Sequence, residues 1–484
     1  MAIAGLEPEL VDWDKPEFSI APIHDDVFTR MADNGLTITY VLTFWDKATY
    51  PDGEGAPCAR FKTEGEIERY LEFVRFIVDH FKDRVQYYEI WNEPDIREYC
   101  PKWIESADYI NLVKRTVPVI REVYPEAKIV VGGVSNTRFS DAYDYLFDLL
   151  ESDIMPLVDV ISWHPMYGTS PEYDLYKDYY YGYPAMVQMI KETAAANGFV
   201  GEYQADELGW STPDTAIPDQ PWVYSETVSA KYTARGIMMH LGMDVTAGFG
   251  GTSHILKLPR MRVIRNLCTI MAGAEPVNLP IEIQSTATNI VSYTFSLPDG
   301  DYLVGLWTDG VAVDEDPGVK ANLTLQGFTG RDVTGIDVLN GFQQPIIASS
   351  ENGNLTIRNL IVRDYPLILT VTKISTTLSC SVSSQEIKQD ESITVSGSIS
   401  PAIEGVTVTL TYTKPDGTTL NRTVTTASDG SFSDAFEPDM VGVWHVTAGW
   451  EGDEDHHGSE SSIASFVVLT DLTHEVTWKD VTYR

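Results

Sequence analysis

The feature that most constrains the fold of this chain is a regular alternation of apolar and amphipathic segments across its first half. The apolar segments are rich in Val, Ile, Thr and aromatic residues and are bounded by charge, Gly or Pro, which is typical of buried strands. They begin at residues 36, 85, 128, 158, 199 and 245. Amphipathic helices are predicted after them, over 63–81, 105–123, 141–151, 183–196, 226–241 and 260–272. Because strands separated by helices pair in parallel, the sequence predicts an α/β barrel with polar loops at its carboxyl edge.

One of these polar loops follows the strand at 85–91 and contains the run Trp91-Asn92-Glu93-Pro94. A Glu in this position can donate a proton to a glycosidic oxygen, and an adjacent Asn amide can hydrogen-bond a sugar hydroxyl. The simpler alternative is a strand-to-helix loop in which Pro94 begins the helix.

Sugar hydrolysis by this route needs a second carboxylate at another strand end. The strand that begins at residue 199 supplies Glu207, followed by a Gly that permits a turn and by Trp210, whose flat ring suits a sugar. Two other acids compete with it. Glu202 lies at the strand start, where we expect it to face the bottom of the barrel or solvent. Asp206 precedes Glu207 directly, so alternation predicts that it points to the opposite side.

These motifs resemble those of the retaining glycoside hydrolases of clan A, the (β/α)8 group that includes families 5 and 39. The resemblance rests on Trp-Asn-Glu-Pro-Asp at 91–95, Ser-Trp-His-Pro-Met-Tyr at 162–167 and Glu-Leu-Gly-Trp-Ser-Thr at 207–212. It implies that Glu93 is the acid/base after strand four and that Glu207 is the nucleophile after strand seven.

The same resemblance implies a set of substrate-binding residues. Asn92 matches the residue that binds the sugar 2-hydroxyl, while His164 and Tyr167 match the polar pair of strand six near the nucleophile. Trp45 and Trp210 are expected to stack on sugar rings. The implied chemistry requires no metal and no organic cofactor.

Counted against the clan pattern, the six predicted strands are strands three to eight. Residues 2–6 are expected to hold the tail of strand two, and residues 20–33 a helix. We therefore expect an N-terminally truncated barrel without its first strand and most of its second, which would expose sheet edges. Strand eight also departs from the pattern, because residues 247–251 read Ala-Gly-Phe-Gly-Gly where the clan often has a Trp.

The composition changes near residue 275 to short alternating strands separated by Gly, Asp, Pro and Asn. The predicted organisation is a TIM-barrel catalytic domain over 1–275, a β-sandwich over 276–373, an Ig-like β-sandwich over 374–470 and a tail or linker over 471–484. The four acids of the loop at 309–316 suggest either a calcium site or, more simply, a solvated acidic loop.

The net charge and the cysteines limit the classes of binding partner and the location expected for this protein. The net charge of −37 argues against nucleic acid as a partner, and the apolar runs are too short for membrane insertion. We expect an extracellular or cell-surface protein whose signal peptide is lost with the N-terminus. Cys58 and Cys100 both follow barrel strands and are candidates for a disulfide, whereas Cys268 and Cys380 are expected to be buried single thiols.

The predicted function is that of an O-glycoside hydrolase, a retaining β-glycosidase of the cellulase, β-glycanase or β-xylosidase type. It would act on β-linked polysaccharide or oligosaccharide by double displacement, with carboxyl groups about 5–5.5 Å apart. The alternative is a catalytically inactive carbohydrate-binding or scaffold protein with a truncated barrel. The missing strands favour this alternative, and the intact Asn92, Glu93 and Glu207 count against it.

Overall fold

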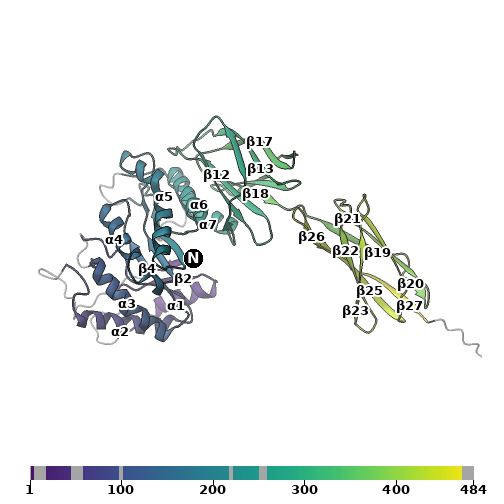
Figure 1. Cartoon of the computed structure of the whole chain (residues 1–484), viewed down its shortest axis with the longest axis horizontal. Helices are drawn as coiled ribbons and strands as arrows, with labels where there is room; N and C mark the ends of the chain where they lie inside the picture. The colour runs from purple at the N-terminus through teal and green to yellow at the C-terminus, as the bar shows by residue number, and fades with distance from the viewer. Residues whose placement is uncertain are drawn as a thin grey trace, which may run out of the picture.

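The structure, a computed structural model, describes residues 2–4, 18–44, 58–97, 102–216, 222–249 and 259–470. Figure 1 shows a helix-rich first part, a middle β part beside it, and a second β part at the far end of the molecule. Within the described ranges, no helix has the length and apolarity needed to cross a membrane.

The first part is a parallel sheet with helices between its strands. Its strands are β1 Ala2–Ala4, β2 Ile38–Val41, β3 Tyr87–Glu89, β4 Lys128–Val134, β5 Val160–Trp163, β6 Met166–Tyr167, β7 Glu202–Gly209 and β8 Thr246–Phe249. Its helices are α1 Pro22–Asp33, α2 Glu64–Phe81, α3 Ser106–Val123, α4 Ser140–Leu150, α5 Asp174–Ala196, α6 Glu226–Gly242 and α7 Pro259–Ile270, with a short 3₁₀ turn at Met155–Leu157.

The pairing order β1-β2-β3-β4-β5-β7-β8 is that of successive strands of a (β/α)8 barrel, with β6 extending along β7. Every one of these pairings is parallel. The predicted fold class and the predicted order of strands are therefore confirmed, and β1 occupies the position expected for the tail of strand two. Among the described residues, no pairing joins β1 to β8.

Helix α2 illustrates why the sequence forms these elements. The Thr63 hydroxyl accepts the backbone N–H of Glu66 and caps the first turn. Apolar side chains then recur every three or four positions, so that one face of the helix packs against the strands. These buried residues are Ile67, Tyr70, Leu71, Phe73, Val74, Ile77, Val78 and Phe81.

The middle part is a sandwich of two antiparallel sheets. One has the order β10-β13-β17-β16 and the other the order β15-β14-β18-β12-β11-β9. The strands are β9 Glu275–Pro276, β10 Ile281–Ser285, β11 Ile290–Ser296, β12 Tyr302–Thr308, β13 Val319–Gln326, β14 Asp332–Asp337, β15 Phe342–Pro345, β16 Ala348–Glu351, β17 Asn354–Val362 and β18 Leu367–Thr372.

The central strands β12, β14 and β18 of the six-stranded sheet are buried on both faces. On one face, Val304 and Leu306 join the core shared with the four-stranded sheet. On the other face, Leu303 and Trp307 join a core that includes Met238 of α6 and further residues of α7. A strand covered on both sides reads as a continuous apolar run, as β12 does. The barrel and the middle sandwich therefore share a hydrophobic core.

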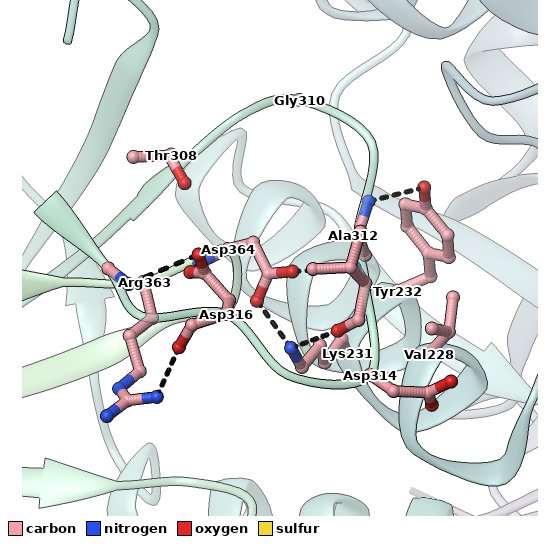
Figure 2. Close-up of polar contacts among 12 residues, drawn as sticks. Val228, Lys231, Tyr232, Thr308, Gly310, Ala312, Asp314, Asp316, Arg363 and Asp364 are labelled. Atoms are coloured by element: carbon pink, nitrogen blue, oxygen red, sulfur yellow. Dashed lines mark hydrogen bonds and ion pairs between the residues drawn. The ribbon is translucent and has the colours of Figure 1, made fainter.

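A buried ion pair lies beside this shared core, where a loop of the middle sandwich crosses α6 (Figure 2). The Lys231 ammonium donates to Asp364 Oδ1 at 2.7 Å and to the carbonyl of Val313 at 2.5 Å. Asp364 Oδ2 accepts the Val313 N–H at 2.8 Å. Both charged side chains are almost completely buried, at 2% and 6% exposure, so each depends on the other for its charge compensation.

The acidic loop at 309–316 takes part in the same junction. Asp309 accepts hydrogen bonds from Tyr180 and from Trp307. Asp316 accepts the N–H groups of Gly318 and Asp364. Protein donors thus engage the carboxylates of both acids. Asp309 joins the loop to α5 of the barrel through Tyr180, whereas Asp316 holds the loop within the middle sandwich.

The second β part is another sandwich, which we call the C-terminal sandwich. Its sheets have the orders β19-β21-β24 and β20-β27-β25-β22-β23, with β26 paired to β25. The strands are β19 Thr377–Val382, β20 Glu386–Lys388, β21 Ile393–Ser400, β22 Thr407–Thr413, β23 Thr419–Thr425, β24 Ser431–Phe436, β25 Gly442–Gly452, β26 His457–Glu460 and β27 Ala464–Leu469. Its separate core surrounds Trp444 and Tyr412. The predicted tail at 471–484 lies outside the described residues.

The cysteine expectations have mixed outcomes. Cys58 is an exposed free thiol, and its candidate partner Cys100 lies outside the described residues. Cys380 is half-buried, whereas Cys268 is exposed. The prediction of a buried Cys268 was wrong because α7 directs Val263 and Leu267 into the core and leaves position 268 on its outer side.

Candidate active site

The loop after β3 holds Glu93 in an uncommon backbone conformation. Trp91 and Glu93 have φ angles of 71° and 49°, in the left-handed region that residues other than Gly rarely occupy. The Glu93 N–H donates to the carbonyl of Gly133 at 2.8 Å. The Trp91 ring is buried and its Nε1 donates to the carbonyl of Lys102 at 2.9 Å. These anchors maintain the strained loop, and such strain is often found at functional sites.

Glu93 and Glu207 meet at the carboxyl edge of the sheet, with His164 and Tyr167 beside them. The His164 Nδ1 lies 3.1 Å from Glu93 Oε1 and 3.7 Å from Glu207 Oε2. The Tyr167 hydroxyl donates to Glu207 Oε2. One ligating atom from each of Glu93, His164 and Glu207 can be chosen so that all three lie within 4.8 Å of one another. The structure therefore brings together these four predicted site residues.

Both ring nitrogens of His164 face carboxylate oxygens, an arrangement that favours the protonated ring. Its side chain is 1% exposed, and its Nε2 lies 3.4 Å from Asp206 Oδ1. Burial alone would lower the pKa of His164, but Asp206, Glu93 and Glu207 outweigh burial and raise that pKa to about 10. A protonated imidazole has no lone pair for a metal. Although Glu93, His164 and Glu207 have the spacing of a metal site, their charges favour acid–base chemistry.

Asp206 does not point away from Glu207 as strand alternation predicts, so that expectation was wrong. Asp206 approaches the Nε2 of His164 while Glu207 approaches its Nδ1. The reason is an irregularity in β7, whose pairing with β8 changes register between Ala205 and Leu208. Glu202 is placed as expected at the strand start, where the Tyr87 hydroxyl donates to it at 3.0 Å.

The glycine in β8 explains part of the unusual strand-eight sequence. A Cβ on Gly248 would lie 2.4 Å from the carbonyl oxygen of Asp206. Only a residue without a side chain permits this approach of β8 to the bulged part of β7.

Beneath the site lies a buried acid that the motif comparison did not select. Glu89 is 1% exposed, and the Ser162 hydroxyl donates to its Oε1 at 2.7 Å. Burial first, and then the charge of Asp206, raise the pKa of Glu89 well above its ordinary value. The available sequence signal was a single acid inside an otherwise apolar strand, since a buried carboxyl requires specific partners.

The remaining predicted substrate-binding residues have different outcomes. Asn92 is half-buried in the loop between Trp91 and Glu93, and Trp45 lies outside the described residues. Trp210 is 1% exposed, stacks on Tyr232 and donates from Nε1 to a backbone carbonyl. It cannot present its face to a sugar, and that prediction was wrong because the ring packs inward against α6.

Trp222 is a further aromatic residue that the sequence offers for sugar stacking. Its ring packs edge-on against Tyr176 and closely against Gly168, just after Tyr167. Within the described ranges, its Nε1 is buried and has no hydrogen-bond partner.

The order of the parallel strands, the helices between them and the polar carboxyl edge define a protein of the (β/α)8-barrel class with appended β-sandwiches. In particular, the structure is similar to a family 39 glycoside hydrolase from the gut symbiont Bacteroides cellulosilyticus WH2. The TM-score is 0.54 and the sequence identity 16%, over 76% of this chain and 75% of the other. The expected resemblance to (β/α)8 glycoside hydrolases is thus confirmed at the level of the fold.

Two further likenesses are weaker. A family 44 endoglucanase from Clostridium thermocellum gives a TM-score of 0.49 at 12% identity, over 73% of this chain and 84% of the other. The catalytic domain of a family 30 xylanase from Talaromyces cellulolyticus gives 0.48 at 11% identity, over 74% and 82%. No family model and no curated protein matches the sequence.

Proposed function

We propose that this protein is a retaining β-glycosidase in which Glu93 is the acid/base and Glu207 the nucleophile. The observation that carries the proposal is the short approach of the two carboxylates, whose nearest oxygens lie within 4.8 Å. This spacing suits direct attack by a carboxylate on the anomeric carbon. An inverting enzyme must leave room for a water and separates its carboxyl groups by about 6.5–9.5 Å.

The reaction has two balanced steps. Glu93 gives its proton to the leaving glycosidic oxygen while Glu207 attacks the anomeric carbon, so that the C–O bond breaks and a glycosyl ester forms. A water then attacks the anomeric carbon, Glu93 takes its proton, and the ester bond breaks to release Glu207. Tyr167 orients the nucleophile and favours its ionised form by donating to Glu207 Oε2.

The proposed substrate is a β-linked oligosaccharide or polysaccharide without acidic groups. The net charge of −37 disfavours the approach of a strongly acidic polymer. We also propose that the protein acts outside the cell or at its surface, where such polymers are found. The alternative of an inactive carbohydrate-binding protein uses the same site without turnover.

Incubation with aryl β-glucoside, β-xyloside and β-mannoside is expected to yield hydrolysis of at least one, with the β-anomer as the first product. Double displacement inverts the anomeric carbon twice and so retains its configuration. Proton NMR during the first minutes, before mutarotation, measures the anomer. An initial α-anomer would contradict the retaining mechanism. Binding of all three sugars without any turnover would favour the carbohydrate-binding alternative.

Removal of residues 375–484 is expected to leave turnover of a small aryl glycoside within a few-fold of the parent. The C-terminal sandwich has its own core, and Figure 1 shows the middle sandwich between it and the barrel. The interface includes backbone and side-chain contacts of Arg331 and Lys373 with residues 453–455. Steady-state kinetics, with circular dichroism to verify folding, provides the measurement. A ~100-fold loss, about 2.7 kcal/mol, in a folded variant would place part of the site in the deleted sandwich.

A further inference from the structure

Three ionisable side chains form a buried row below the two carboxylates of the site. Glu89 and His164 are each 1% exposed, and Asp206 is 3% exposed. A side-chain hydrogen bond joins Glu89 on β3 to Asp206 on β7, and Asp206 Oδ1 lies 3.4 Å from the Nε2 of His164. The reaction proposed above makes no chemical use of Glu89 or Asp206. An isolated buried charge is costly, so the positive and negative charges within this row must compensate one another.

We propose that Asp206, held by the neutral acid Glu89, is the positioning residue that keeps His164 positively charged between Glu93 and Glu207. The inference rests on the proposed function of Glu93 and Glu207 and deepens it. According to this inference, the buried pair Glu89 and Asp206 sets the pH range in which the two carboxylates are active.

The proton of the pair belongs to Glu89. Burial and the neighbouring Asp206 both raise the pKa of Glu89. Burial also raises the pKa of Asp206, but the charge of His164 and the hydrogen bond from Glu89 both favour the anionic form of Asp206. Ser162 Oγ donates to Glu89 Oε1, so the other oxygen of Glu89 carries the proton. The pair therefore holds one proton and one negative charge, and this charge faces His164.

The other titratable groups around His164 come from several elements. Glu93 follows β3, Glu207 lies on β7, and Tyr167 lies on β6 with its hydroxyl 3.5 Å from His164 Nδ1. Tyr109 of α3 is also close to the acid pair, but burial raises its pKa and keeps it neutral. Without Asp206, burial would favour the neutral form of His164. The fraction of His164 that is protonated would fall, and with it the positive charge beside Glu93 and Glu207.

The consequence for turnover has a definite sign. A cation within 4 Å of a carboxylate favours its ionised form, so loss of that cation raises the pKa of the carboxylate. In the Asp206→Asn variant, the acidic limb of the kcat/KM profile is expected to move to higher pH by roughly 1–3 units. In Glu89→Gln the neutral amide replaces a neutral acid and still donates to Asp206, so the profile is expected to stay near that of the wild type.

Nitrogen-15 NMR of histidine-labelled protein tests the charge directly and requires no turnover. At pH 8 the wild type is expected to show imidazolium signals for His164, assigned by their loss in His164→Asn. Asp206→Asn is expected to show a neutral ring at that pH, and Glu89→Gln an imidazolium. His240 is an internal control, because burial lowers its pKa to about 4 and it should be neutral in every variant.

A neutral His164 in the wild type at pH 8 would overturn the inference, even if Asp206→Asn failed to fold. So would a charged His164 in a folded Asp206→Asn variant, or a neutral one in Glu89→Gln. The expected NMR signals together with full activity of Glu207→Gln would instead contradict the proposed function while leaving the charge assignment intact.

Discussion

Replacement of Glu207 by Gln is expected to lower kcat/KM for an aryl β-glycoside by about 10⁴-fold or more, equivalent to about 5 kcal/mol of transition-state stabilisation. The amide retains the size of the side chain but cannot form the glycosyl ester. Loss of a nucleophile eliminates the covalent route, and a nearby water offers little compensation where the two carboxylates are so close.

Glu202→Gln is the matched control, because it makes the same change at the other end of the same strand. Glu202 is half-exposed and contacts Tyr87 and Lys128, away from His164. Its substitution is expected to change kcat/KM by no more than a few-fold. If Glu207→Gln kept a tenth of the parent activity while Glu202→Gln or Asp206→Asn abolished it, the nucleophile would have to be reassigned.

Replacement of Asp364 by Ala is expected to destabilise the barrel and the middle sandwich together, by about 3–5 kcal/mol. The substitution leaves the ammonium of Lys231 buried with a single backbone acceptor and also removes the acceptor of the Val313 N–H. For a unit of roughly 370 residues, whose unfolding entropy is about 2.1 cal/mol/K per residue, the midpoint of thermal unfolding should fall by roughly 4–6 °C. Differential scanning calorimetry would measure it.

Two comparisons make this prediction specific to a buried charge. Asp439→Ala removes the carboxylate of an exposed pair with Lys414 in the C-terminal sandwich and is expected to leave the midpoint nearly unchanged. The double substitution Lys231→Met with Asp364→Leu removes both charges and is expected to recover at least half of the loss. Equal destabilisation by the single and the double variant would show that packing, and not charge, dominates at this junction.

Much of the fold could be predicted because its cause is local. Strands β2 to β5 are buried along almost their whole length and read as continuous apolar runs, while the helices between them show a period near 3.6. Helix α5 was predicted to begin at residue 183, yet it begins at Asp174. Pro184 lies inside the helix, and the preceding tyrosines complete the earlier turns.

The part of the site that could be predicted is the part marked by polar residue types at the ends of strands. Glu93, Glu207, His164 and Tyr167 follow strand ends, and the carboxyl ends of parallel strands converge at one edge. The turn of Asp206 toward His164 depends on the bulge in β7 and on the close approach of Gly248 to it. These features arise from a register between distant strands, which no local pattern encodes.

The two covered faces of the six-stranded sheet have a consequence for how this architecture can be rearranged. The barrel cannot be separated from the middle sandwich without exposing Leu303, Trp307 and the facing side of α6 to water. Evolution or an engineer must therefore exchange these two parts as one cassette, with its border after residue 373 and not near residue 275. The C-terminal sandwich, which has its own core, is the natural exchangeable module.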